Sequence, residues 1–229
     1  MKQIYILLIL LLAVMPSCKS TPSDEDKGGS YIRHSTSTGD HSGTDHSGKD
    51  LSGARLEGVK LVNSRMYKTN LSNACLNCAD LRNADMRKSD LSGAELFSAD
   101  LRNADLTDAD LVKSDLYRAN LSGASLKHAD LRGADLRAAD LRNANLNHAN
   151  LRGADLRGAN LFGSRVRRAY LTAADLRKAN LRTADLSHAE LTGVKLRGAD
   201  LGGAIISRRW KSTLIHMQIR NFKTIVWVE

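Results

Sequence analysis

A five-residue period runs through most of this 229-residue chain. In the segment ADLRNADLTDADL, residues 99–111, leucine recurs at every fifth position and alanine stands two positions before each leucine. An α-helix turns by about 100° per residue, so leucines five residues apart wind around it and form no apolar face. A continuous strand places such leucines alternately on opposite sides. Neither element alone accounts for the period.

A short extended stretch followed by a corner does account for it. Ala99 and Leu101 point to one side of such a stretch, and Asp100 points to the other side. Residues 102–103 then form the corner, and Ala104 begins the next stretch. Because the leucine faces inward on every stretch, the chain must coil around an axis.

The repeat is long and its register is unbroken. From Leu51 to Leu201 there are 31 consecutive units, and the central residue is leucine in 28 of them. From Ala54 to Ala204, the residue two positions before the next centre is alanine in 24 of 31 units. Repetition of this regularity is typical of a solenoid.

The units ADLRN, ANLSG and ADLRG resemble the A(D/N)LXX signature of the pentapeptide-repeat family. The resemblance implies an all-β fold, a right-handed quadrilateral β-helix with four units per coil and just under eight coils over residues 51–206. The second corner position agrees, because glycine and asparagine tolerate the positive φ of a type II turn. These residues stand there at multiples of twenty: Gly53, Gly93, Gly133, Gly153 and Gly193 on one side, and Asn83, Asn103 and Asn143 on another.

The N-terminal residues 1–17 are typical of a signal peptide. Lys2 precedes an apolar run, IYILLILLLAVM, that is shorter than the roughly 20 residues of a membrane span. The following MPSCKS resembles the lipobox of bacterial lipoproteins, which implies lipidation of Cys18 (palmitate among the acyl chains). Ordinary secretion and an uncleaved anchor are the alternatives. Lys19 favours the outer membrane of a bacterial cell envelope, with a secreted or periplasmic protein as the second expectation.

Two further segments flank the repeat. Residues 18–50 are polar and predict a flexible linker in which His34, His41 and His46 are solvated, with weak metal binding by these histidines as the alternative. Residues 207–229 leave the repeat pattern and predict a C-terminal cap on the last coil. Ile215, Ile219 and Phe222 have helical spacing there, and TIVWV is typical of a strand. A dimer contact through this segment and a disordered tail are the alternatives.

The repeat places residues of like chemistry in columns twenty residues apart. One column at the second corner position is mostly basic and is a candidate binding surface for phosphates or anionic sugars, with solvated corners as the alternative. Its candidate residues are Lys68, Lys88, His128, His148, Arg168, His188 and Arg208, and Asp108 interrupts it. Another column holds Arg137, Arg157, Arg177 and Arg197 beside Asp115, Asp135, Asp155 and Asp175, which predicts surface ion pairs.

Cys75 and Cys78 form the motif CLNC. In an oxidising envelope this spacing is compatible with a disulfide across the corner, with two free thiols or, as half of a site, with a metal. The sequence presents no nucleophile–base pair, phosphate loop or metal-ligand set, so we expect no enzyme, no cofactor and no metal.

These features predict a non-catalytic cell-envelope lipoprotein, a rigid binding or spacer module attached to the membrane through its N-terminal lipid. Its partner is an unknown protein or an acidic polymer. Some members of the resembled family imitate DNA and bind gyrase, which makes DNA mimicry an alternative. The net charge of +9 has the wrong sign for a mimic of DNA, and export disfavours a cytoplasmic target. The third candidate is electrostatic binding of an acidic envelope polymer; nucleic acid is the less favoured partner.

Overall fold

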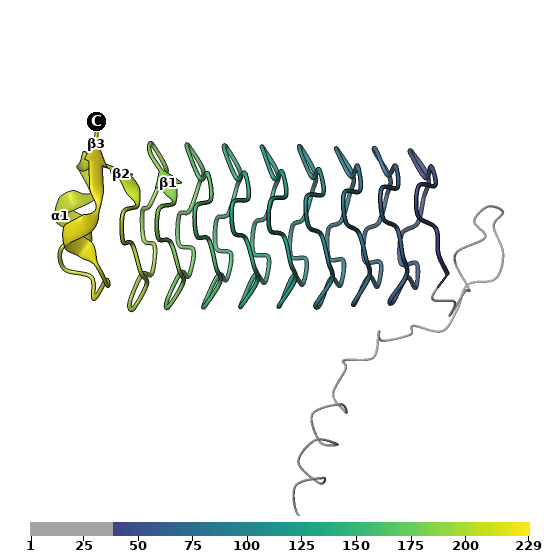
Figure 1. Cartoon of the computed structure of the whole chain (residues 1–229), viewed down its shortest axis with the longest axis horizontal. Coiled ribbons are helices and arrows are strands. Elements are labelled where there is room, and N and C mark those ends of the chain that lie inside the picture. Colours follow the sequence, from purple (N-terminus) through teal and green to yellow (C-terminus); the bar gives the residue numbers. More distant parts are fainter. Residues whose placement is uncertain (1–38) are drawn as a thin grey trace, which may run out of the picture.

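The computed structural model describes residues 39–229, which form a rod of stacked coils (Figure 1). Parallel β-bridges join residues twenty positions apart, from Asp40 paired with Lys60 to Asn180 paired with Asp200. One coil therefore contains four five-residue units, as the resemblance implies. The predicted signal peptide (1–17), the candidate lipidation site Cys18 and the linker up to residue 38 lie outside the described residues.

Backbone hydrogen bonds hold each coil to the next. The amide of Leu101 donates to the carbonyl of Asn120 at 2.7 Å, and the amide of Asn103 donates to the carbonyl of Ser122 at 3.1 Å. Within the unit, the amide of Ala104 closes the corner on the carbonyl of Leu101 at 3.0 Å. Because this pattern recurs unit after unit, the coils stack like parallel strands, at roughly 4.8 Å per coil.

Leucine and alanine fill the interior, as the period predicts. Leu101 and Leu121 have no exposed surface, and the alanines between the leucines are equally buried. Serine replaces alanine at four positions, where each hydroxyl donates to a carbonyl of its own unit at 2.6 to 2.8 Å: Ser64, Ser89, Ser114 and Ser164. The narrow core thus accepts small polar side chains only where the backbone supplies an acceptor.

The aspartate of the signature stabilises the corner that follows it. The Asp105 carboxylate accepts a hydrogen bond from the backbone amide of Thr107 at 3.0 Å, and Asp110 accepts one from Val112 at 2.9 Å. Side-chain-to-backbone bonds two residues apart are typical of Asx turns. Many of the outward-facing carboxylates therefore stabilise the corners of the coil.

The second corner residue has positive φ in nearly every unit, whatever its type. Gly153 has φ 66° and Asn103 has φ 57°, as expected for residues that tolerate this region. Lys88 and Arg168 also adopt it, with φ 59° and 56°. The stacked coil imposes the corner even on side chains that disfavour it.

The coil begins earlier than the sequence predicts. Asp40, Asp45 and Asp50 bridge to the next coil, so residues 40–50 belong to the β-helix and the predicted linker cannot extend to residue 50. His41 and His46 occupy the positions that leucine fills elsewhere. His46 is 5% exposed, and its Nε2 lies 2.7 Å from Oγ1 of Thr44. Histidine at the central position disguised the register, although HSGTD and HSGKD keep the five-residue spacing.

The C-terminal segment covers the last coil (Figure 1). Strand β1 (Asp185–Leu186) pairs in parallel with β2 (Ile205–Ser207), and β2 pairs with β3 (Val226–Val228). Between β2 and β3 lie the 3-10 helix η1 (Arg208–Trp210), the short helix α1 (Lys211–Leu214) and the 3-10 helix η2 (Phe222–Thr224).

Helix α1 is shorter than the sequence suggests, and a different face of it is buried. Leu214 is fully buried, whereas Ile215 is 58% exposed. The helical spacing of Ile215, Ile219 and Phe222 therefore fails at Ile215, because the backbone leaves the helix at Leu214, whereas Ile219 and Phe222 are partly buried against the core. The expected strand at the end is present as β3, and the indole of Trp210 donates to the carbonyl of Ala189 at 3.0 Å.

Candidate anion-binding groove

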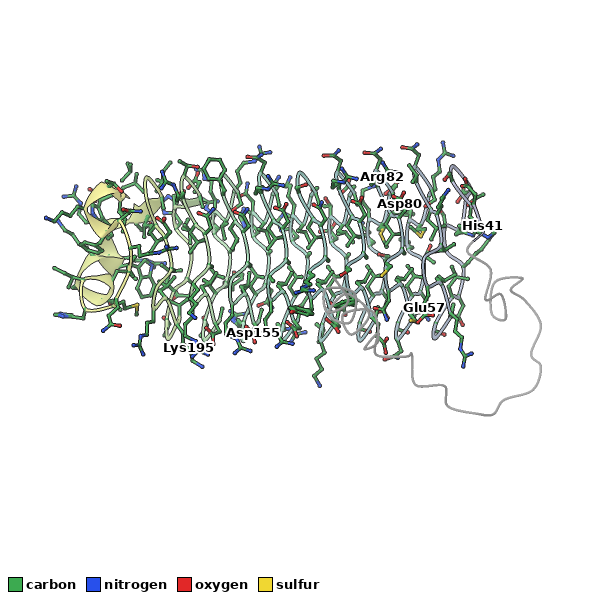
Figure 2. The ribbon with its side chains drawn as sticks, turned by 60° about the horizontal axis from the view of Figure 1, so that its bottom comes forward. His41, Glu57, Asp80, Arg82, Asp155 and Lys195 are labelled. Carbon is green, nitrogen blue, oxygen red and sulfur yellow. The ribbon has the colours of Figure 1, made fainter. Side chains whose placement is uncertain are left out.

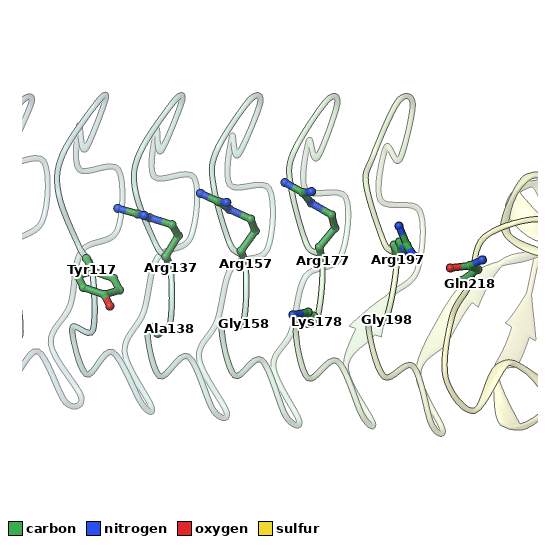
Figure 3. Close-up of a pocket in the computed structure, with 10 residues that line it drawn as sticks. All are labelled: Tyr117, Arg137, Ala138, Arg157, Gly158, Arg177, Lys178, Arg197, Gly198 and Gln218. Atoms are coloured by element: carbon green, nitrogen blue, oxygen red, sulfur yellow. The ribbon is translucent and has the colours of Figure 1, made fainter.

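One face of the rod carries a groove, which we call the arginine groove (Figure 3). On this face the first corner position holds large side chains, while the second holds small ones in three of four coils: Ala138, Gly158 and Gly198. The missing side chains leave a hollow of about 820 Å³. It is lined by Tyr117, Arg137, Ala138, Arg157, Gly158, Arg177, Lys178, Arg197, Gly198 and Gln218.

The first three arginines are each held by an aspartate of the same unit. Nε of Arg157 donates to Oδ1 of Asp155 at 2.9 Å, and Nη2 donates to Oδ2 at 2.6 Å. Arg177 and Asp175 repeat these two distances. Arg137 binds Asp135 in the same two-pronged way and lies 3.9 Å from the Asp155 carboxylate of the next coil. Figure 3 shows the three side chains extended in parallel along the row.

These pairs fix the arginines without using all of their donors. The hydrogen bonds to aspartate use Nε and Nη2, so within residues 39–229 Nη1 of Arg157 and of Arg177 has no protein acceptor. The hydrogen bond from Arg177 lowers the pKa of Asp175 against the opposing effect of burial. At Asp155 burial opposes ionisation most, but the side chain and backbone of Arg157 still lower its pKa. Both carboxylates therefore stay ionised and hold the guanidinium planes in place.

The C-terminal end of the groove has an excess of positive charge. The fourth arginine, Arg197, has Lys195 where the other three have aspartate, and no acid pairs with it among residues 39–229. Lys178 extends the cluster on the groove floor. A smaller hollow of about 480 Å³ continues around this end and is lined by Lys195, Arg197 and His216 among others. The charge of the groove is therefore concentrated where the coil meets the C-terminal segment.

The opposite end of the groove is aromatic. Tyr117 lies 5.7 Å from Phe97, between ring centroids. The guanidinium carbons of Arg137 and Arg118 lie 5.1 and 5.3 Å from the Tyr117 centroid. The ring thus lies within cation–π distance of two arginines.

The same face changes character further toward the N-terminus, where Glu57 replaces arginine. Figure 2 shows Glu57, Asp155 and Lys195 along one side of the rod, away from the Asp80–Arg82 pair. Along this face, the first corner position therefore changes from Glu57 in an early coil to arginine from residue 137 onward.

The predicted basic column is a row of corner residues in the structure. Six of its seven members have positive φ, namely Lys68, Lys88, His128, His148, Arg168 and His188. The rings of His128 and His148 stack with centroids 4.9 Å apart. Partial burial, His128 and Arg168 lower the pKa of His148.

The predicted seventh member of that column does not belong to it. Arg208 is the first residue of η1, where the backbone has left the coil, and its Nε lies 4.0 Å from a Glu229 carboxylate oxygen. The column is therefore shorter than the twenty-residue spacing implies.

The two cysteines of the CLNC motif are not joined to each other. Cys78 is exposed and carries a free thiol, so the disulfide between Cys75 and Cys78 is absent. Cys75 is buried at a bridge position, with its sulfur 3.2 Å from Oε1 of Glu57. The two residues occupy different positions of the repeat: Cys75 lies at a β-bridge, and Cys78 lies at the second corner position with φ 58°.

Residues 39–229 lack two kinds of functional feature. That part of the chain holds no group of three or more histidine, cysteine, aspartate or glutamate residues arranged to bind a metal ion. It also holds no helix with the length and apolarity needed to cross a membrane.

The arginine column could be identified from the sequence, but the groove beside it could not. The missing signal was in the neighbouring column, where small residues recur at 138, 158 and 198. Tyr117 is not basic, so it was not part of the predicted arginine column. Gln218 lies in the groove lining because of the path of the C-terminal segment, which the five-residue period does not predict.

The chain matches the family described as pentapeptide repeats over overlapping segments from residue 42 to residue 203. It is a pentapeptide-repeat protein. It is 36% identical to HetL, a pentapeptide repeat protein involved in heterocyst differentiation regulation in the cyanobacterium Nostoc sp. strain PCC 7120. That alignment covers 73% of this chain and 89% of HetL, with a TM-score of 0.37.

Among solved structures, this pentapeptide-repeat protein also resembles trypsin-treated QnrB1 carrying R167E. QnrB1 is a plasmid-mediated fluoroquinolone resistance protein. The TM-score is 0.61 at 21% identity, over 83% of this chain and 92% of that one, which shows the shared right-handed quadrilateral β-helix. A pentapeptide repeat protein of the Arabidopsis thaliana thylakoid lumen is 31% identical over 59% of this chain and 70% of its own, with a TM-score of 0.16. No curated protein matches the chain.

Proposed function

We propose that this protein is a non-catalytic, rigid binding module that holds an anionic partner in the arginine groove. The observation that carries the proposal is the row of four arginines over a floor of small residues. Three of the guanidiniums are held in place by aspartate, and the fourth adds unbalanced charge. A preorganised row loses little side-chain entropy when an anion binds.

The N-terminal sequence supports an envelope location for this module. Residues 1–17 have the composition of a signal peptide, and Cys18 stands in a lipobox-like context. In this proposal, a lipid on Cys18 attaches the rod to the envelope, and the polar segment after it separates the groove from the membrane. Cys18→Ser should then move the protein out of the membrane fraction and abolish palmitate incorporation. Palmitate labelling of that variant would contradict lipid attachment at Cys18.

Binding of polyaspartate by the full chain tests the groove itself. We expect binding that weakens steeply as salt rises, because ion pairs at an exposed surface are screened. The double variant Arg157→Ser, Arg177→Ser should weaken it about tenfold or more. The matched control is Arg132→Ser, Arg142→Ser, which removes the same charge from two arginines that bind Asp130 and Asp140 on other faces. Equal loss in both double variants would mean that net charge, and not the groove, binds the anion.

The surface gives less support to DNA mimicry. A mimic needs a dense array of unbalanced acids, whereas aspartates along this rod are repeatedly paired with arginine two residues later, as in Asp80–Arg82 and Asp140–Arg142. Inhibition of gyrase supercoiling by the full chain would favour mimicry instead.

A further inference from the structure

We infer that the arginine groove takes an acidic polysaccharide, lying lengthwise along the rod with its charged end at Arg197. This inference rests on the proposed function, because it names the chemical class of the anion. Three features support it: the spacing of the guanidiniums, the shape of the groove floor, and the arginines that lie against the aromatic ring of the groove lining.

The spacing suits a linear polymer of sugars. Arg137, Arg157 and Arg177 stand on successive coils, so equivalent groups recur at roughly 4.8 Å. This repeat is close to the length of one sugar unit in an extended polysaccharide. Because successive sugars of an extended polyuronate are rotated about its axis, carboxylates at regular intervals along the polymer, rather than on every sugar, face the row and can meet a guanidinium without bending the polymer or the rod.

The floor suits sugar rings. Ala138 and Gly158 leave an open surface between the arginines and the next corner, and a Cβ added at Gly158 would meet no atom within 4 Å, while Lys178 bounds this surface toward Gly198. A flat ring can lie on this surface while its carboxylate reaches the arginine row. The free Nη1 donors of Arg157 and Arg177 are available for that carboxylate, because the aspartates use only Nε and Nη2.

The aromatic end disfavours a single-stranded nucleic acid. Nucleic-acid channels of this kind stack bases on open aromatic faces. Tyr117 is the aromatic residue of the groove lining, and the guanidiniums of Arg137 and Arg118 already lie against its ring. A base cannot stack there without displacing them, whereas a sugar polymer needs no stacking platform.

The uneven charge gives the polymer a direction. Arg137, Arg157 and Arg177 form ion pairs with aspartate, whereas within residues 39–229 no ion pair joins Arg197, Lys178 or Lys195 to an acid. The unbalanced cluster therefore contributes most of the attraction, and the balanced arginines set the position of the rest of the polymer. Removing Arg197 should cost more affinity than removing Arg137.

Affinity measurements on the full chain test this inference with polygalacturonate, polyaspartate and single-stranded DNA as probes at equal charge concentration. We expect polygalacturonate to bind about tenfold more tightly than either other polymer. Galacturonate monomer should bind far more weakly, since it contacts one coil. Arg197→Ser should weaken polygalacturonate about tenfold, while Arg142→Ser leaves it unchanged.

The outcomes separate the two proposals. If polyaspartate binds in the groove as tightly as polygalacturonate, the protein is an anion-binding module without preference for sugars, and only the present inference is overturned. If single-stranded DNA binds more tightly than polygalacturonate, the ligand class is wrong. If none of the three binds, the proposed function itself fails.

A substitution in the groove floor gives a second test and leaves every charged residue in place. Gly158→Asn places a side chain on the floor, and asparagine tolerates the positive φ of 70° found there. We expect it to weaken polygalacturonate about tenfold and to leave the flexible polyaspartate within about twofold of wild type. Equal effects on both polymers would contradict a sugar ring on the floor.

Discussion

The imidazole of His46 stands edge-on to that of His41, with ring centroids 6.2 Å apart and planes at 68°. Both rings occupy positions that leucine fills in later coils. His46 is nearly enclosed and contacts Thr44 and Lys49. The first coil therefore closes the apolar core with imidazole rings in place of leucine side chains.

This closure makes stability depend on pH. Burial, Lys49 and His41 lower the pKa of His46 from its ordinary value of 6.5, while Asp45 opposes them. The unfolded chain then binds more protons than the folded chain as the pH falls, so stability is complete above 6.5 and decreases below it. Thermal unfolding at about pH 5 and about pH 7.5 should show the loss. His46→Leu should reduce it, while His188→Asn, a change at an exposed corner, should keep it.

The corner conformation can be tested at two neighbouring coils. Gly153 has φ 66°, and an added methyl group there would meet no atom within 4 Å, so Gly153→Ala changes only the backbone preference. We expect a loss of about 1 kcal/mol of unfolding free energy. Ala173 has φ 59° at the equivalent corner one coil later, so Ala173→Gly should gain about 1 kcal/mol. Chemical denaturation measures both, and shifts of the same sign would contradict the turn geometry.

The inward leucines should control stability and the surface arginines should not. Leu131 is fully buried, so Leu131→Asp places an unpaired carboxylate in the core and should cost more than about 3 kcal/mol. Leu136→Asp should behave in the same way. Arg137→Ser removes a half-buried surface ion pair and should cost less than about 1 kcal/mol. Equal melting temperatures for the three variants would refute the arrangement.

Helix α1 offers a test of the C-terminal closure. Leu214 is fully buried and the next residue, Ile215, is largely exposed. Leu214→Ala should therefore destabilise by about 2–5 kcal/mol. Ile215→Ala should change the unfolding free energy by less than about 0.5 kcal/mol. A larger effect at Ile215 in solution would show that this face is covered, for example by a second copy of the chain.

Much of the fold could be predicted because one physical requirement repeats. Leu101 and its equivalents must face inward, and a five-residue period allows this only in a coil. The start of the coil could not be predicted in the same way, because histidine at 41 and 46 hides the apolar signal while the aspartates at 40 and 45 keep the bridges. The periodicity gave no guidance after Ile206, where non-repeating contacts such as Trp210 with Ala189 determine the path.

The candidate site was harder to predict than the fold. The arginine column is visible in the sequence, but its ion pairs with Asp135, Asp155 and Asp175 suggested only a solvated surface. The groove depends on the absence of side chains beside the column, which matters only once neighbouring coils are stacked. Arg197 differs from the other arginines because Lys195 replaces an acid, a local change within an otherwise regular pattern.

The twenty-residue coil also has a consequence for how such a protein can change over generations. An in-frame duplication of one whole coil within residues 117–197 would insert a further arginine into the row and keep every other face in register. Copying a segment of the gene would thus lengthen the arginine row, and each added coil would have a backbone that already stacks.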